Sequence, residues 1–190
     1  MNKNKIVFTF ATAEVNFIGQ IFIKITELLT GKLKLKKLYD EYLSENRPPE
    51  LFWDDAVDKL NFTLITNFQD GSYIPKKGKL IVIANHAFGV ADGVSICSAI
   101  SKVRQDYKMV THKVLRQAEA VKDKILPIDF NENREALITN INTRKEAEKV
   151  LHNEGVLVLF PSGTIATKQN LKKNTKADDG EWKQWVSKLV

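Results

Sequence analysis

The sequence is poor in cysteine and histidine: Cys97 is the only cysteine, and there are three histidines among 190 residues. A single cysteine excludes an internal disulfide and fits a reducing compartment. Because Cys97 lies on the apolar stripe of an expected helix, we predict that it packs in the core. The histidines are too far apart in sequence for a local metal motif, and there is no zinc signature, so no metal site is predicted.

Long apolar runs are also missing. Asn16, Gln20, Lys24 and Glu27 interrupt the longest candidate, so we predict no transmembrane helix. The basic N-terminus is not followed by an apolar segment with a small-residue cleavage site, which argues against export. Together with the single cysteine, these absences predict a cytoplasmic protein.

Neither a zinc-finger pattern nor an aromatic RNA-binding pattern is present. The net charge of +6 nevertheless favours an anionic partner, such as a membrane surface or a phosphorylated substrate. Nucleic acid is the weakest of these candidates, and we predict no nucleic-acid partner.

What is present is the composition of an ordinary globular domain, 43% hydrophobic and 27% charged. Strand-like and helix-like patterns alternate along the chain, which predicts an α/β fold: a layered structure with a largely parallel central sheet flanked by helices. The expected strands are 62–66, 80–84, 107–111, 125–128 and the apolar run after Gly155. The expected helices include one across 114–121 and one that begins at the capping-box pattern Thr143-Arg-Lys-Glu146.

The N-terminal residues have a different pattern. Residues 14–29 and 35–43 repeat apolar side chains at helical spacing, which predicts an amphipathic helical pair ahead of the sheet. A lysine cluster beside this apolar face is typical of a helix that binds an anionic membrane surface; its members are Lys32, Lys34, Lys36 and Lys37. Packing of the face on the rest of the domain explains it equally well. We therefore divide the chain into an N-terminal amphipathic segment, residues 1–47, and an α/β domain, residues 48–190.

Residues 80–93 contain the strongest candidate site. The apolar, β-branched run 80–84 predicts a strand buried on both faces, and helical spacing resumes after Gly93. His86 would follow the carboxyl end of the strand and Asp92 would lie near the first turn of the helix, where ligands bind in open α/β sheets. A histidine beside a carboxylate is a general-base pair, although a structural histidine that caps the helix fits this stretch about as well.

A second apolar run leads directly into the turn Pro161-Ser-Gly-Thr164. The blocks at 85–93, Asn-His-Ala-Phe-Gly-Val-Ala-Asp-Gly, and at 160–163, Phe-Pro-Ser-Gly, resemble those of the glycerolipid (lysophospholipid) acyltransferase superfamily. Within it, the chain is most similar to the hemolysin-like branch, near the ornithine-lipid acyltransferases. The order and spacing of the motifs carry this resemblance, which runs from about residue 20 to residue 165.

The resemblance implies an O-acyltransferase of phospholipid biosynthesis, which works at the inner face of the membrane. It would move a fatty acyl group from a thioester of acyl carrier protein or coenzyme A to a lysolipid hydroxyl. His86 would be the base, oriented by Asp92, and the thioester would be a co-substrate with no cofactor bound. Backbone amides of the second block would bind the acceptor or steady the oxyanion. The implied substrate-binding residues are Phe160, Pro161, Ser162, Gly163 and Thr164.

The chain also departs from the family pattern. His86 and Asp92 are separated by five residues instead of four, and Ser162 stands where the superfamily has glutamate. A lipid esterase that uses Ser162 as nucleophile is an alternative, although the Gly-x-Ser-x-Gly elbow is missing. A peripheral membrane-binding module without turnover is another alternative, because the chain ends soon after the second block and looks truncated at its C-terminus.

Overall fold

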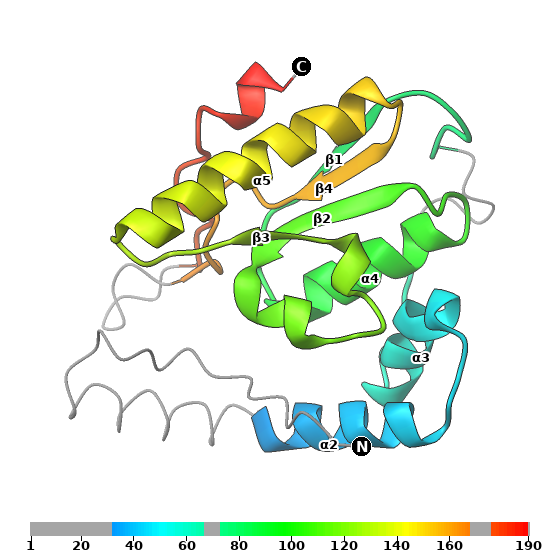
Figure 1. The fold of residues 1–190 in the computed structure, drawn as a ribbon. Helices are drawn as coiled ribbons and strands as arrows, with labels where there is room; N and C mark the ends of the chain where they lie inside the picture. Colours follow the sequence, from blue (N-terminus) through cyan, green and yellow to red (C-terminus); the bar gives the residue numbers. More distant parts are fainter. Residues whose placement is uncertain (1–31, 67–72, 168–175, 190) are drawn as a thin grey trace, which may run out of the picture.

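The computed structural model describes residues 32–66, 73–167 and 176–189 (Figure 1). The predicted helix across 14–29 lies outside these residues, whereas the second predicted helix is present as α2. In chain order the elements are α2 (Lys32–Ser44), the 3-10 turn η1 (Pro49–Leu51), α3 (Phe52–Lys59), β1 (Leu80–Ile83), α4 (Val90–Ser101), β2 (Tyr107–His112), η2 (Lys113–Gln117), η3 (Lys122–Lys124), β3 (Ile125–Ile128), α5 (Arg134–His152), β4 (Val156–Leu159) and η4 (Val186–Lys188).

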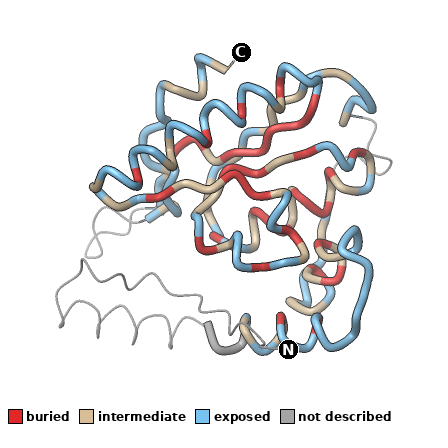
Figure 2. Tube along the Cα trace, in the orientation of Figure 1, coloured by how far each residue is buried: buried red, intermediate tan, exposed pale blue. Residues whose placement is uncertain are grey.

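The four strands form one sheet in the order β1-β4-β2-β3, and all three neighbouring pairs are parallel. The predicted α/β class with a parallel sheet is therefore confirmed. All four residues of β4 are buried, as expected of an apolar strand at the centre of such a sheet. Figure 2 shows buried residues concentrated along the strands.

The sequence predicted that the first strand is buried on both faces, and this prediction is wrong. Three of the four β1 residues are half-buried, and Ile83 is 46% exposed. The reason is the strand order: the chain crosses from β1 to β2 and later inserts β4 between them, so β1 remains at the edge. Its apolar pattern resembled that of a central strand because sequence alone does not specify which strands become neighbours.

Helices cover the two faces of the sheet (Figure 1). On one face α4 packs against Val156, Val158 and Met109, and on the other α5 packs against Leu157 and Leu159. Cys97 of α4 is fully buried, with Sγ 3.7 Å from the sulfur of Met109, so the prediction that it packs in the core is confirmed. Burial raises the pKa of its thiol to about 12, which keeps the sulfur protonated.

The N-terminal helices extend the layer that contains α4. Tyr39 and Tyr42 of α2 are buried against Phe52 of α3, with ring centroids 6.3 Å and 5.2 Å apart. Trp53 then connects α3 to the sheet, because its indole N–H donates to the Tyr107 hydroxyl over 2.5 Å. This part of the amphipathic segment packs on the domain, which was one of its two predicted roles; membrane contact stays a prediction.

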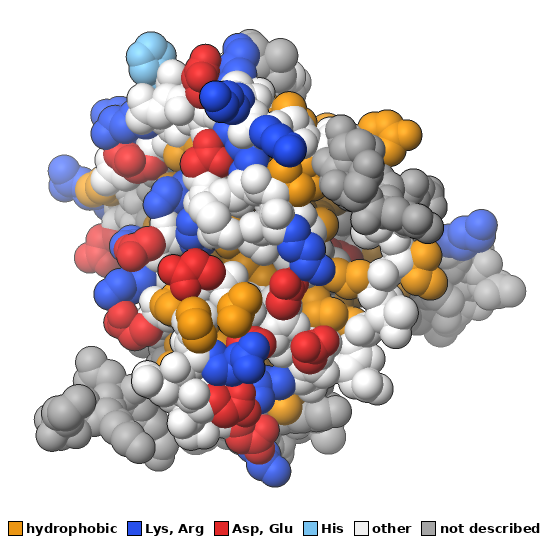
Figure 3. Space-filling model, turned by 90° about the vertical axis from the view of Figure 1, so that its right-hand side faces the viewer, with side chains coloured by type: hydrophobic (Ala, Val, Ile, Leu, Met, Phe, Trp, Pro, Cys, Tyr) orange, Lys and Arg blue, Asp and Glu red, His pale blue; other side chains and the backbone are white. Residues whose placement is uncertain are grey.

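Among the described residues, no helix has both the length and the apolar character needed to cross a bilayer. Figure 3 shows the face at which the strands begin, and there basic and acidic side chains are interspersed. The positive net charge of the protein is therefore not gathered on this face.

Two predicted elements are absent. Residues 62–66 form no strand, although apolar and polar residues alternate there; the amide of Phe62 instead bonds to the Val57 carbonyl at the end of α3. Residues 114–121 form no α-helix but the turn η2 and an extended Ala118. The chain has only twelve residues between β2 and β3, and it uses two short 3-10 turns to reach the adjacent strand.

Helix α5 begins nine residues before the predicted start. Asn133 is its N-cap, and the Asn133 side chain accepts the amide hydrogen of Ala136. Thr143 is not a cap: it lies in the middle of the helix, 2% exposed, and its hydroxyl donates to the Pro127 carbonyl of β3 over 2.5 Å. The capping-box pattern was misleading because Thr143 bonds to the sheet rather than to its own helix.

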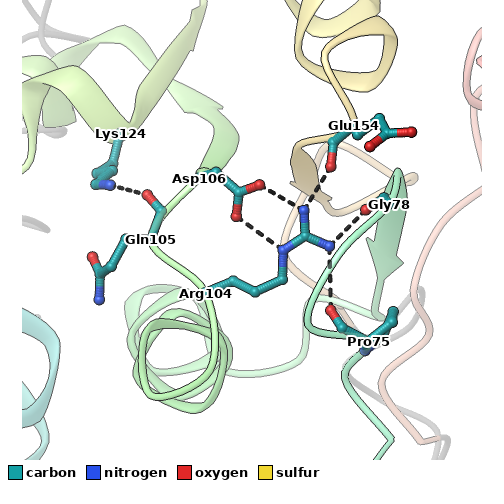
Figure 4. A network of polar contacts seen from close by, with 7 residues as sticks. All are labelled: Pro75, Gly78, Arg104, Gln105, Asp106, Lys124 and Glu154. Atoms are coloured by element: carbon teal, nitrogen blue, oxygen red, sulfur yellow. Dashed lines mark hydrogen bonds and ion pairs between the residues drawn. The ribbon is translucent and has the colours of Figure 1, made fainter.

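Arg104 anchors the loops at the edge where the strands begin (Figure 4). Its guanidinium binds both oxygens of Asp106, with distances of 2.9 Å and 2.6 Å. It also donates to the carbonyls of Pro75 (3.2 Å), Gly78 (2.6 Å) and Glu154 (2.6 Å). Arg104 is 5% exposed and lies where the strands begin, whereas His86 lies where they end. It is therefore a structural anchor rather than a substrate contact.

Candidate active site

His86 and Asp92 meet beyond the carboxyl end of β1. Nδ1 of His86 lies 3.0 Å from Oδ2 of Asp92, and both side chains are largely buried, 20% and 15% exposed. Asp92 lies in the first turn of α4, as its spacing predicted. Because a carboxylate can only accept, this contact assigns the ring proton to Nδ1 and leaves the lone pair of Nε2 available as a base.

The loop between the two residues holds the carboxylate in place. The same Asp92 oxygen accepts the amide hydrogen of Phe88 over 2.8 Å. Gly89 makes this tight turn possible with φ 63°, a conformation that side-chain-bearing residues rarely adopt. A Cβ at this position would also lie 3.1 Å from Cδ1 of Ile165, so the loop touches the chain that follows β4.

The second block follows β4, next to β1 in the sheet. The ring of Phe160 stacks on the imidazole of His86, with centroids 4.2 Å apart and planes 24° apart. Pro161 and Ser162 are buried, whereas Gly163 and Thr164 are exposed. The structure thus brings both predicted blocks together at one edge of the sheet, where β1 and β4 end.

Backbone groups of the second block are only partly available. Gly163 turns the chain with φ 71°, and its amide already donates to the Phe160 carbonyl over 3.0 Å. The amide of Thr164 has no acceptor among the described residues. Of the predicted amide nest, Gly163 is thus engaged within the turn, and Thr164, an exposed residue, is a candidate donor to a ligand.

The Ser162 hydroxyl is engaged away from the imidazole. Its oxygen lies 2.9 Å from the Thr164 carbonyl and 3.0 Å from Oδ1 of Asp179, two acceptors that share its single proton. In a serine triad that proton would instead point at the histidine. Within the described residues, no hydrogen bond joins Ser162 to the ring of His86.

Exposed apolar side chains lie beside this pair, and we refer to Phe88, Val90 and Ile165 as the apolar rim. Phe88 is 79% exposed, Ile165 50% and Val90 47%. The contact between Ile165 and the Gly89 position shows that the two loops of the rim are adjacent. Exposed apolar side chains next to a site are suited to contact with an apolar ligand or surface.

Asp179 is a site residue that the sequence analysis missed. It comes from the segment after residue 175, and Oδ1 accepts the backbone amide of His86 over 2.9 Å. No motif signals this contact, because the two residues are 93 positions apart.

A family model described as Acyltransferase matches residues 65–180, more than half of the chain. The chain belongs to the acyltransferase family. The match covers both blocks and Asp179, and it supports the predicted membership of the glycerolipid acyltransferase superfamily. Neither a curated protein nor a solved structure matches the chain. The hemolysin-like branch stays a prediction.

Proposed function

We propose that this acyltransferase moves a fatty acyl group from a thioester of acyl carrier protein or coenzyme A to a hydroxyl of a lysolipid or related glycerolipid. The observation that carries the proposal is the contact of His86 Nδ1 with Asp92 Oδ2 at the carboxyl edge of the sheet. This contact leaves Nε2 as a base in a member of the acyltransferase family.

In this reaction Nε2 of His86 takes the proton of the acceptor hydroxyl while the oxygen attacks the thioester carbonyl. The new C–O bond forms, the C–S bond breaks, and the imidazolium returns its proton to the departing thiolate. Asp92 stabilises the imidazolium and keeps the ring oriented. Because a thioester is a good acyl donor, one base and correct positioning suffice, with no covalent enzyme intermediate and no bound cofactor.

The surroundings of the pair support a lipid acceptor. The apolar rim offers a surface for an acyl chain next to His86. Thr164 is an exposed residue, and its backbone amide is suited to an anionic group of the acceptor or to the oxyanion. Ser162 stands where the superfamily has glutamate, so a zwitterionic or amino-acid-derived lipid is as good a candidate as lysophosphatidate.

We further propose that the enzyme works in the cytoplasm, at the inner face of the membrane, where both the thioester and the acceptor occur. Residues 14–43 would contact the anionic lipid surface through the lysines of that segment and through its apolar side chains other than Tyr39 and Tyr42, which pack on α3. The esterase alternative is disfavoured by the Ser162 hydroxyl, whose two acceptors are not the imidazole. The following experiment distinguishes an active acyltransferase from a membrane-binding module without turnover.

The experiment measures acyl transfer by the full chain from each thioester to a panel of lysolipids, including lysophosphatidate and an amino-acid-derived lysolipid. We expect transfer by the wild type and a loss on the order of 10²–10⁴-fold in His86→Ala, the usual contribution of a general base. His152→Ala is the matched control, because His152 is exposed at the far end of α5. Rates are normalised to folded protein. Transfer that persists in His86→Ala would overturn the mechanism, and a folded wild type without transfer to any acceptor would favour the non-catalytic module.

A further inference from the structure

The segment 176–189 returns to the second block and runs along it. Thr167 and Asp178 form an antiparallel bridge in which each amide donates to the other's carbonyl over 3.1 Å. Further on, the amide of Lys183 donates to the Pro161 carbonyl over 2.9 Å. These backbone bonds hold Asp179 beside the turn that contains Ser162.

Asp179 collects three donors on its carboxylate. Oδ1 accepts from the His86 amide at 2.9 Å and from the Ser162 hydroxyl at 3.0 Å, and Oδ2 accepts from the indole of Trp182 at 2.9 Å. Burial would raise the pKa of Asp179, but these hydrogen bonds and the nearby imidazole lower it below its usual value of 3.8. The group is therefore a carboxylate at neutral pH.

The position of His86 depends on chain segments that follow β4. Its amide is bound by Asp179, and its carbonyl accepts the amide hydrogen of Ala166 over 2.6 Å. The pairing of β1 with β4 ends before this point, with the amide of Ala84 on the Leu159 carbonyl at 3.4 Å. Past Ala84, side-chain and loop contacts rather than the sheet set where the backbone of His86 lies.

We propose that Asp179 is a positioning residue for acyl transfer, which holds the base His86 and the acceptor-binding turn at Ser162 in one fixed arrangement. This inference rests on the proposed function of His86 and adds a residue that acts through it. A base must lie within hydrogen-bond reach of the proton that it removes, so a shift of about 1 Å in its backbone can cost on the order of 100-fold in rate.

The test compares Asp179→Ala and Asp179→Asn with Asp178→Ala, the neighbouring exposed aspartate, in the full chain. We expect Asp179→Ala to lower kcat per folded molecule on the order of 100-fold with little change in KM for the thioester. Asp179→Asn should lose less, roughly tenfold, because its amide oxygen still accepts from His86 and Ser162. Asp178→Ala should match the wild type.

Hydrogen exchange at the His86 amide is a second readout that does not depend on catalysis. Protection of this amide should fall in Asp179→Ala and persist in Asp179→Asn. Where a variant changes the global stability, the protection is corrected for that change before the comparison. If kcat per folded molecule stays within twofold of wild type in both variants, or if His86 protection is unchanged in Asp179→Ala, the inference is wrong. Should Asp179→Ala fail to fold, the kcat of Asp179→Asn decides alone.

The two proposals fail in different ways. A wild type without transfer contradicts the proposed function but leaves the exchange result at His86 meaningful. A wild type with transfer that depends on His86 but not on Asp179 contradicts only the positioning role.

Discussion

The Nδ1 atom of His86 lies 3.0 Å from Oδ2 of Asp92, and the same oxygen accepts the Phe88 amide hydrogen at 2.8 Å. The carboxylate cannot turn away from the imidazole without also breaking a backbone hydrogen bond. The five residues between the histidine and the aspartate, from the loop after β1 and the start of α4, therefore build the pair, and Gly89 provides the positive φ of the turn.

Asp92→Asn should lower kcat by at least about 100-fold, because an amide neither stabilises the imidazolium nor reliably holds the proton on Nδ1. Acyl transfer normalised to folded protein measures this effect. Asp58→Asn, an exposed aspartate of α3, is the matched control and should be neutral. Activity of Asp92→Asn within threefold of wild type would show that the contact is structural.

Ser162→Ala should reduce transfer by less than about tenfold, since the base and the backbone amides of the turn remain. The lost hydroxyl costs about 1 kcal/mol of stability, the typical value for one hydrogen bond. Kinetics measures the rate of transfer, and mass spectrometry after incubation with the thioester detects any acyl group on Ser162. A loss as large as that of His86→Ala in a variant that still folds would favour the esterase alternative, and an acyl group trapped on Ser162 would establish it.

The protein should bind anionic vesicles through residues 14–43, and cosedimentation should fall as salt rises because exposed charges are screened. Replacing the four lysines of this segment with glutamine should weaken binding by about 1 kcal/mol for each lysine near the surface; these are Lys32, Lys34, Lys36 and Lys37. The control replaces three lysines outside this segment, which are exposed in the loop before β1; these are Lys76, Lys77 and Lys79. Equal binding to neutral and anionic vesicles at every salt concentration would exclude the electrostatic contribution.

Asp179 should make stability depend on pH in the acidic range. Its folded-state pKa is lowered below 3.8, so its contribution is present above that value and is lost as pH falls through the folded pKa. Asp179→Asn should therefore lower the free energy of unfolding at pH 7 and differ less from wild type as pH drops below about 3.8. Denaturant titrations across this range measure the difference. If the difference in free energy of unfolding between the wild type and Asp179→Asn stays constant with pH, the charge of Asp179 is not what stabilises the fold.

Arg104→Ala should destabilise the fold by about 3 kcal/mol, because the carbonyls of Pro75, Gly78 and Glu154, which come from two loops, and the Asp106 carboxylate lose the donor that they share. Turnover per folded molecule should be unchanged, since Arg104 is at the edge opposite His86. Lys145→Ala, an exposed change on α5, is the control for stability. A loss of kcat without a loss of stability would assign Arg104 a role at the site.

Much of the candidate site was predictable because it is local. His86 lies in the loop after β1 and Asp92 in the first turn of the helix that follows, so their spacing and the flanking strand and helix patterns were enough to expect the contact. The second block lies at the end of an apolar run, and parallel strands bring their carboxyl ends to one edge. Misinterpretations arose where a local pattern had a distant partner, as for Thr143, whose hydroxyl bonds to β3 instead of capping a helix.

The sequence by itself determined the α/β class, the parallel strands, the burial of Cys97 and the position of both blocks at strand ends. These follow from periodicity and from short spacings, which act through neighbouring residues. The folded chain was needed to establish that β1 is an edge strand, that residues 62–66 pair with nothing in the described sheet, and that Asp179 binds the His86 amide. Each of these depends on which distant segments meet, and that choice is made by packing of the whole domain rather than by any local preference.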